Sequence, residues 1–123
     1  MKKLNVLFDG GVPRPLRKLL QPHRITTTQE LGWEQLKNGA LLQTAEADFD
    51  VLISTDSNIK YQQALPDYDI ALIVLRAFRI SIKYFEPLVP QILRTLETIE
   101  PGQAVYIYAD QKLAQKDQRK GRG

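Results

Sequence analysis

Two runs of this sequence are apolar almost throughout and too short to be helices. They read VLIST at 51–55 and IALIVL at 70–75. Strands that are covered on both faces have this composition, because neither face of the strand meets water. Such strands belong to parallel sheets, whose connections pass over the faces as helices. These two runs therefore restrict the chain to folds with a covered, largely parallel sheet.

The rest of the chain supplies further strands and the helices that cover them. Shorter β-branched or aromatic runs predict strands at 4–8, 23–28 and 104–108. Apolar residues at helical spacing predict helices at 16–20, 36–49, 58–65 and 82–99. Pro87 and Pro90 place the regular part of the last helix from about Pro87 onward. Strands that alternate with helices predict an α/β fold, a three-layer α/β/α sandwich with a mostly parallel central sheet and right-handed crossovers.

Length and composition bound the possibilities further. The chain has 123 residues, which is the size of one domain, and it contains no cysteine. The lack of cysteine excludes disulfides and thiolate metal sites and fits a reducing compartment. No run approaches the ~20 apolar residues of a membrane span, and Met1 to Lys3 do not open a secretory signal. We expect a cytoplasmic protein with no membrane partner.

The positive charge is concentrated at the C-terminal end. Residues 112–123 contain five basic residues and one acidic residue, a net charge of +4, whereas the whole chain carries +3. The stretch KDQRKGRG has no apolar residue, which predicts disorder. We therefore expect a folded domain over 1–110 and a basic, disordered tail over 111–123. The tail either improves solubility or binds phosphates of RNA or DNA.

Aspartates follow two of the predicted strands directly. Asp9 ends the run at 4–8 and precedes Gly10 and Gly11, and Asp56 ends the run at 51–55. Ligands of open parallel sheets bind beyond the carboxyl ends of the strands, where both carboxylates would face one crevice. Two carboxylates that share a site favour a hard cation such as Mg²⁺ or Mn²⁺. In the alternative interpretation, both aspartates form turns, and Asp56 caps the following helix.

Several neighbouring residues are candidates for substrate contact. Asn58 could donate a hydrogen bond in the site or cap the helix at 58–65, and Tyr61 lies on that helix. Arg76 follows the strand at 70–75, where it could bind a phosphate or pair with Asp9 or Asp56. Arg14 lies on the polar side of the helix expected at 16–20.

Two single-copy residues have structural interpretations as well as functional ones. His23 is the only histidine, which argues against a histidine-based metal cluster or a catalytic triad, and we expect a structural or surface role. Trp33 could stack on an unpaired base, or it could pack over the edge of the sheet. We favour packing, since tryptophan is highly buried on average.

The motifs taken together resemble a known family. The stretches are VLFDGGVPRPLRKLL at 6–20, TTTQELGW at 26–33, LKNGALLQTAE at 36–46 and VLISTDSNIKYQQ at 51–63, with IALIVLR at 70–76. They resemble PIN-like domains, in particular a compact bacterial group related to VapC-like ribonuclease toxins. The resemblance covers about residues 4–108, and it depends on the combination of motifs, because each motif alone is weak.

The resemblance implies a metal-dependent endoribonuclease. In PIN domains, acidic side chains at the carboxyl ends of the strands bind Mg²⁺ or Mn²⁺, which activates water against an RNA phosphodiester. On this basis Asp9 and Asp56 are metal ligands, and Glu30 is a third catalytic candidate. The family also suggests the toxin component of a toxin–antitoxin pair, with a cognate antitoxin as partner and a possible homodimer.

The sequence departs from the family at two places. Many relatives have Glu directly after the first aspartate, where this chain has Gly10, and an acidic residue where it has Ala40. The departures support a second hypothesis, a catalytically impaired module that binds RNA or a protein. A third hypothesis, a phosphate-accepting receiver-like domain, lacks the acidic pair and the lysine that it needs.

Overall fold

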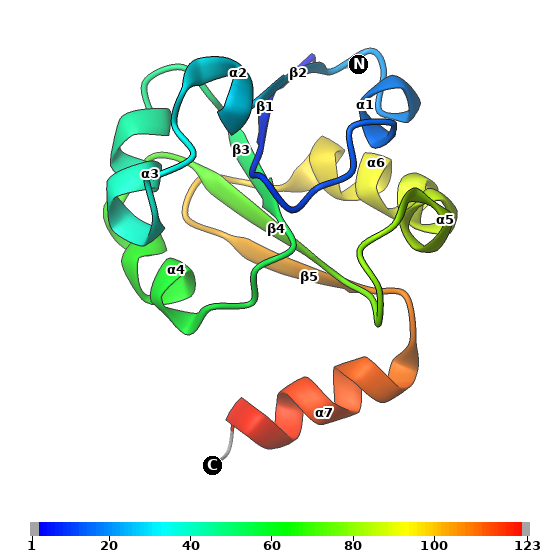
Figure 1. The fold of residues 1–123 in the computed structure, drawn as a ribbon. Coiled ribbons are helices and arrows are strands. Elements are labelled where there is room, and N and C mark those ends of the chain that lie inside the picture. The colour runs from blue at the N-terminus through cyan, green and yellow to red at the C-terminus, as the bar shows by residue number, and fades with distance from the viewer. Residues whose placement is uncertain (1–2, 122–123) are drawn as a thin grey trace.

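The computed structural model describes residues 3–121, without the side chains of residues 59 and 118–121. Five strands form one sheet in which all neighbouring strands are parallel, in the order β2-β1-β3-β4-β5 (Figure 1). They are β1 (Asn5–Phe8), β2 (Arg24–Thr27), β3 (Val51–Ser54), β4 (Ala71–Arg76) and β5 (Ala104–Tyr108). The predicted α/β class is confirmed, and each strand lies where its apolar run predicts it.

Short helices connect the strands. They are α1 (Leu16–Leu19), α2 (Thr28–Leu31), α3 (Asn38–Ala45), α4 (Ile59–Ala64), α5 (Ile82–Phe85), α6 (Val89–Thr98) and α7 (Gln111–Gly121), with 3₁₀ turns at Leu65–Asp67 and Glu86–Leu88. The single helix expected at 82–99 is therefore two helices, because Pro87 lies in the turn and only Pro90 occupies a first helical turn. None of the helices described within 3–121 is long and apolar enough to cross a membrane.

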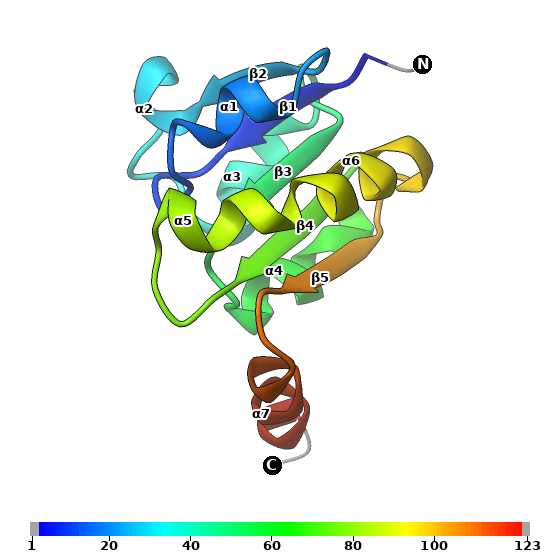
Figure 2. The ribbon, with the colours of Figure 1, turned by 90° about the vertical axis from the view of Figure 1, so that its right-hand side faces the viewer.

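Alternate residues of each central strand point into two separate cores. Val6, Phe8 and Ile53 pack on one face against α1, α5 and α6. Leu7 and Leu52 pack on the other face against α3 and α4. Figure 2 shows α1, α5 and α6 in front of the sheet and α3 and α4 behind it. The sheet is covered on both faces, which explains the nearly continuous apolar runs.

One of the four crossovers departs from the expected right hand. The step from β1 to β2 runs in one direction along the sheet, and α1 covers one face. The steps from β2 to β3 and from β3 to β4 run in the opposite direction, and their helices cover the opposite face. A change of both direction and face leaves the hand the same, so these three crossovers share one hand. The step from β4 to β5 continues in the direction of β3 to β4, but α5 and α6 cover the face of α1 (Figure 2). This last crossover is left-handed, which is rare. Burial gives the reason: α1 has only four residues, and α6 covers the apolar surface that α1 leaves open.

The C-terminal segment differs from the disordered tail that its composition predicts. Residues Gln111–Gly121 form α7, which projects beyond β5 (Figure 1). Leu113 is buried, and Asp117 forms an ion pair with Arg76 at the end of β4. These contacts help to attach a polar helix that has little apolar surface of its own. The part of the expected tail at 122–123 lies outside the described residues.

Candidate functional site

Asp9 occupies the switch point of the sheet, where β1 lies between β2 and β3. Its Oδ1 accepts a hydrogen bond from the backbone N–H of Gly11 at 3.0 Å, and its Oδ2 accepts one from the hydroxyl of Ser54. The backbone N–H of Thr55 also donates to this carboxylate. Burial raises the pKa of Asp9 above its usual value, and the charge of Asp56 adds to the increase, although these hydrogen bonds oppose it. The side chain is therefore fixed in position by hydrogen bonds to both of its carboxylate oxygens.

Ser54 connects the two aspartates. It is the fully buried last residue of β3, and its hydroxyl donates to Asp9 while accepting the backbone N–H of Asp56 at 2.9 Å. Sequence reasoning did not single out Ser54. The available signal was a hydroxyl residue at the end of an otherwise apolar buried strand, where a polar side chain needs a partner.

Asp56 is exposed and shapes the turn that follows β3. Its Oδ1 accepts the backbone N–H of Asn58 at 2.9 Å, and Asn58 Oδ1 in turn accepts the N–H of Lys60 at 3.0 Å. The capping role considered for Asn58 is thus observed, at the start of α4. Asp56 therefore forms a turn-stabilising bond, and its side chain also lines the cleft described next.

Gly11 allows the loops after β1 and β3 to lie in contact. A Cβ atom at this position would lie 2.2 Å from the side-chain oxygen of Thr55, far inside van der Waals contact. At Gly10 a Cβ would meet only the flexible end of Gln29, at 3.1 Å. The close approach at Gly11 therefore brings the Asp9 and Asp56 segments together.

A cleft of about 470 Å³ opens at this edge of the sheet, between the loops after β1 and β3 and the segment from α2 to α3. Asp9 and Asp56 line it, together with Trp33, Lys37 and Tyr61. The structure thus brings together the two aspartates that sequence reasoning placed at one edge. Lys37 adds a positive charge at the same cleft.

Tyr61 and Trp33 form apolar parts of the cleft wall. Burial, reinforced by the charges of Asp9 and Asp56, raises the pKa of Tyr61 to about 12, so its phenol remains protonated at neutral pH. The Trp33 ring packs edge-on against Phe49, with ring centroids 6.2 Å apart. Trp33 therefore packs over the sheet, as favoured from the sequence, and also contributes to the cleft.

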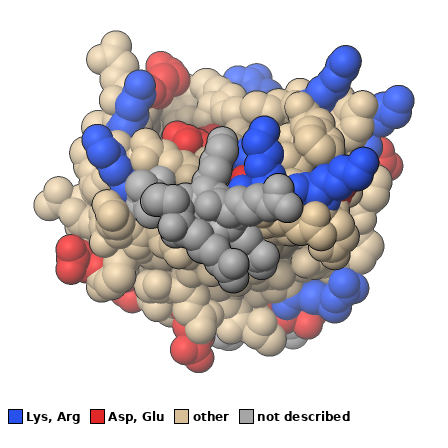
Figure 3. All heavy atoms as spheres, turned by 90° about the horizontal axis from the view of Figure 1, so that it is seen from below, with Lys and Arg blue, Asp and Glu red and all other residues tan. Residues whose placement is uncertain are grey.

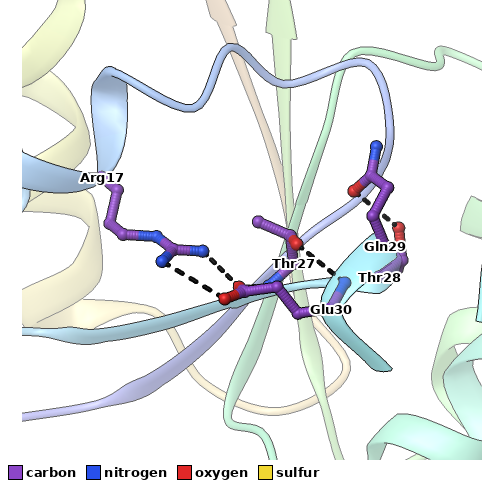
Figure 4. Close-up of polar contacts among 5 residues, drawn as sticks. All are labelled: Arg17, Thr27, Thr28, Gln29 and Glu30. Carbon is purple, nitrogen blue, oxygen red and sulfur yellow. Dashed lines mark hydrogen bonds and ion pairs between the residues drawn. The ribbon is translucent and has the colours of Figure 1, made fainter. Parts of the chain in front are cut away.

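Glu30 does not join the aspartates. Its carboxylate pairs with Arg17 and accepts a hydrogen bond from the backbone N–H of Thr27. In return, the hydroxyl oxygen of Thr27 accepts one from the backbone N–H of Glu30 (Figure 4). This capping box starts α2, a helix that the sequence did not predict. The hydrogen bond from Arg17, together with that from the Thr27 backbone, lowers the pKa of Glu30. Glu30 lies in a separate hollow of about 380 Å³ with Arg14, so neither residue lines the cleft.

Arg76 has a different partner from those considered from the sequence. Its Nε and one terminal nitrogen donate to the two carboxylate oxygens of Asp117, at 2.8 and 3.0 Å. The pairing with Asp9 or Asp56, which the sequence offered as an alternative to phosphate binding, is not formed, because α7 brings its own carboxylate to the end of β4. The bidentate pair occupies the arginine and raises its pKa.

Two further residues complete the comparison of prediction and structure. Glu34 lines the cleft and was not predicted from the sequence, although it directly follows Trp33, which was considered for base stacking. His23 is buried, and its Nδ1 accepts the backbone N–H of Leu4 at 3.1 Å, which confirms a structural role. Burial lowers the pKa of His23, so the ring is a neutral acceptor.

The donor set limits which cation the cleft could hold. Within 3–121 there is no group of three or more His, Cys, Asp or Glu residues placed to bind one metal ion. Asp9 and Asp56 supply oxygen ligands of the kind that Mg²⁺ and Mn²⁺ prefer, and such ions often use only one or two carboxylates. The residues therefore fit one hydrated divalent cation and do not fit a pair of ions bridged by several carboxylates.

Comparison with known proteins adds no relative: no protein-family model, curated protein or solved structure matches this chain. The site must therefore be interpreted from its own geometry.

Proposed function

We propose that the protein is a metal-dependent endoribonuclease that cleaves RNA phosphodiesters in the cleft. The main support is that Asp9 and Asp56 follow neighbouring strands and line one cleft, with Ser54 bonded to both segments. A bound Mg²⁺ or Mn²⁺ would supply an activated water and neutralise developing negative charge on the phosphate. The resemblance to PIN-like domains points to the same chemistry.

Each residue has a defined part in this proposal. Asp9 and Asp56 bind the cation, and Ser54 keeps Asp9 oriented toward it. Lys37 attracts the phosphate backbone, and Tyr61, which is protonated at neutral pH, walls the cleft without acting as a base. Asn58 holds the turn that carries Asp56 through its cap on α4. Glu30, Arg14 and Arg76 have no part, since their side chains lie outside the cleft or are paired elsewhere.

Cleavage of a single-stranded RNA of mixed sequence tests the proposal. The purified protein is incubated with Mn²⁺, Mg²⁺ or a chelator, beside Asp9→Asn, Asp56→Asn and the control Asp48→Asn. Asp48 is exposed and lies at the opposite end of the sheet. We expect metal-dependent cleavage in the wild type and Asp48→Asn, and at least a hundredfold loss in the other two. Cleavage that persists in Asp9→Asn and Asp56→Asn, or that needs no metal, would contradict the proposal.

A specific observation favours a second candidate, a module that binds RNA or a protein without cleaving it. The described residues contain no three-ligand group, and Gly10 and Ala40 stand where many PIN-like relatives are acidic. In that case the wild type would bind RNA in the presence of chelator and leave it intact with Mn²⁺. Asp9→Asn would then bind at least as well, because it removes a negative charge from the binding surface.

We extend the first proposal to a toxin–antitoxin role, which the resemblance suggests. Induced expression of the wild type in a bacterial host should then arrest growth, and expression of Asp56→Asn should not. A cognate antitoxin would form a complex that restores growth. If the wild type cleaves RNA in vitro but does not slow growth at matched expression, the toxin role is contradicted and the nuclease proposal is retained.

A further inference from the structure

The segment between β4 and α5 exposes apolar side chains that the fold does not use. Phe78 is 62% exposed and Ile80 is 61% exposed, and Tyr84, within α5, is 36% exposed. The other large exposed apolar side chains described, Leu19 and Leu31, are each below 40% and lie on different helices. Adjacent exposed apolar groups commonly mark an interaction surface. We call Phe78, Ile80 and Tyr84, with the two cations between them, the 78–84 patch.

The cations of this patch identify the charge of its partner. Arg79 and Lys83 are exposed and alternate with the apolar residues in the order Phe78, Arg79, Ile80, Lys83, Tyr84. The Lys83 ammonium lies 5.9 Å from the centre of the Tyr84 ring. No Asp or Glu occurs between residues 77 and 85. A surface that alternates aromatic rings with cations suits a strand that alternates bases with phosphates.

The 78–84 patch and the cleft both follow carboxyl ends of neighbouring strands. β3 and β4 are paired in parallel with Ser54 opposite Val74, so the chain reaches Asp56 and Phe78 shortly after two neighbouring strand ends. The basic helix α7 follows β5, the next strand along, and exposes Lys112 and Lys116. Figure 3 views the molecule from below Figure 1, the side on which α7 projects, and shows Lys and Arg side chains standing out around this face.

We propose that the 78–84 patch binds the unpaired bases of a single-stranded nucleic acid and guides the strand toward the cleft. Phe78 and Tyr84 stack on bases, Ile80 contacts a base face, and Arg79 and Lys83 neutralise phosphates. This inference rests on the proposed function for the direction of the strand, since it specifies that the substrate is single-stranded. The binding event itself needs neither the metal nor cleavage.

Charge favours this occupant over a second copy of the chain. In a two-fold symmetric contact the same patch lies on both subunits, so Arg79 and Lys83 of one subunit would share the interface with Arg79 and Lys83 of the other. Like charges placed together in an interface are unfavourable. A strand with one negative charge for each nucleotide instead complements the two cations.

Binding in the presence of chelator tests the patch separately from catalysis. Fluorescence anisotropy is measured with labelled single-stranded RNA, single-stranded DNA and a duplex of the same sequence. Phe78→Ala should weaken single-strand binding by about 5- to 30-fold, as loss of a stacking contact does. Arg79→Gln should lower the slope of log affinity against log salt by about one phosphate contact. The matched controls Leu19→Ala and Arg94→Gln change exposed residues on α1 and α6 and should leave affinity unchanged.

The possible results separate the two proposals. Affinity unchanged in both Phe78→Ala and Arg79→Gln overturns the patch, and it does so whether or not the wild type cleaves RNA. Tighter binding of the duplex overturns the single-strand assignment. Equal binding of single-stranded RNA and DNA supports recognition through bases and phosphates, without contacts to the 2′-hydroxyl. Self-association that disappears in Phe78→Ala, seen by sedimentation without nucleic acid, overturns the proposal in favour of a dimer interface. Loss of binding in Phe78→Ala together with no cleavage by the wild type supports the patch and rejects the nuclease.

Discussion

The two ends of the sheet carry carboxylates in different ways, and β3 shows both. Asp56 follows this strand at the carboxyl end, where it lines the cleft with the buried and hydrogen-bonded Asp9. Asp50 precedes the strand at the amino end, where it accepts the backbone N–H of Asn5 at 2.8 Å. There it lines a hollow of about 440 Å³ with three further acidic residues: Glu46, Asp48 and Asp69.

The difference shows that packing around a carboxylate tells more than the number of carboxylates. The amino end has more acidic groups, but exposed positions such as Asp48 leave them solvated. The cleft at the carboxyl end is lined by fewer acidic residues, but two loops in contact at Gly11 and Thr55 hold Asp9 with three donors. Fixed orientation and partial burial are typical of functional carboxylates, whereas a solvated acidic face more often keeps a protein soluble.

The largest expected effect comes from separating the two loops of the carboxyl end. Gly11→Ala places a methyl group 2.2 Å from the Thr55 oxygen, so either the Thr55 side chain must leave its position or the Asp9 and Asp56 segments must move apart. We expect a loss of about 3 kcal/mol in the free energy of unfolding, measured by urea denaturation. Gly10→Ala is the matched control, since its methyl group meets only the end of Gln29. Equal stability of the two variants would show that the loops are not in tight contact.

The next effect comes from removing the hydroxyl that connects the aspartates. Ser54→Ala leaves the Asp9 carboxylate without one donor and the Asp56 N–H without its acceptor, inside a buried strand end. We expect a loss of about 2 kcal/mol by thermal or urea unfolding, together with weaker cleavage. Ser57→Ala changes an exposed serine nearby and should have little effect on either quantity. If Ser54→Ala is as stable as Ser57→Ala, the two hydrogen bonds of the Ser54 hydroxyl do not contribute to stability, which contradicts this prediction.

A smaller, pH-dependent effect is expected near the amino end, at His23. Burial lowers the pKa of its ring, and Glu97 opposes this more weakly. The unfolded chain therefore binds a proton more readily than the folded protein, so stability falls as the pH decreases through about 6.5. His23→Asn keeps an acceptor for the Leu4 N–H and does not titrate, so it should lose less stability than the wild type between pH 8 and 5.5. Parallel urea midpoints of the two proteins over that range would exclude this contribution.

The smallest effect concerns the acidic hollow itself. Asp48→Lys places a cation among Glu46, Asp50 and Asp69, which relieves repulsion between like charges. We expect a gain of a few tenths of a kcal/mol at low salt, about the size of an exposed ion pair, which shrinks at 0.5 M salt. Gln43→Lys adds the same charge at an exposed position that does not line the hollow. A gain of equal size in Gln43→Lys would reflect net charge and not the hollow.

The sequence predicts the sheet and the two aspartates because their signals are local. Apolar runs such as IALIVL define the strands, and an aspartate at the end of each run can be placed by the direction of the strand alone. The α2 helix was missed because only the reciprocal bonds of Thr27 and Glu30 start it, and four residues show no periodicity. The sequence predicted one helix at 82–99, where the structure has α5, a turn and α6.

Long-range partners are the features that the sequence could not reveal. Arg76 and Asp117 are 41 residues apart, and the composition around Asp117 indicated disorder, so nothing local predicts their ion pair. The face that α6 covers was also mispredicted, because the usual crossover rule carries no information about how little surface α1 can cover. Both features depend on what the rest of the fold leaves unsatisfied.

The left-handed crossover has a consequence for the order in which this chain can acquire structure during synthesis. When residues up to about 76 have left the ribosome, four strands and the helices of one face are present. The other face then has only α1 over Val6, Phe8, Ile53 and Ile73. It stays open until the segment that forms α5 and α6 emerges. Nascent chains in this interval expose an apolar sheet surface of the kind that chaperones bind. We therefore expect ribosome-bound chains in which only residues up to about 80 lie outside the exit tunnel to recruit chaperones more strongly than chains in which α5 and α6 have also emerged.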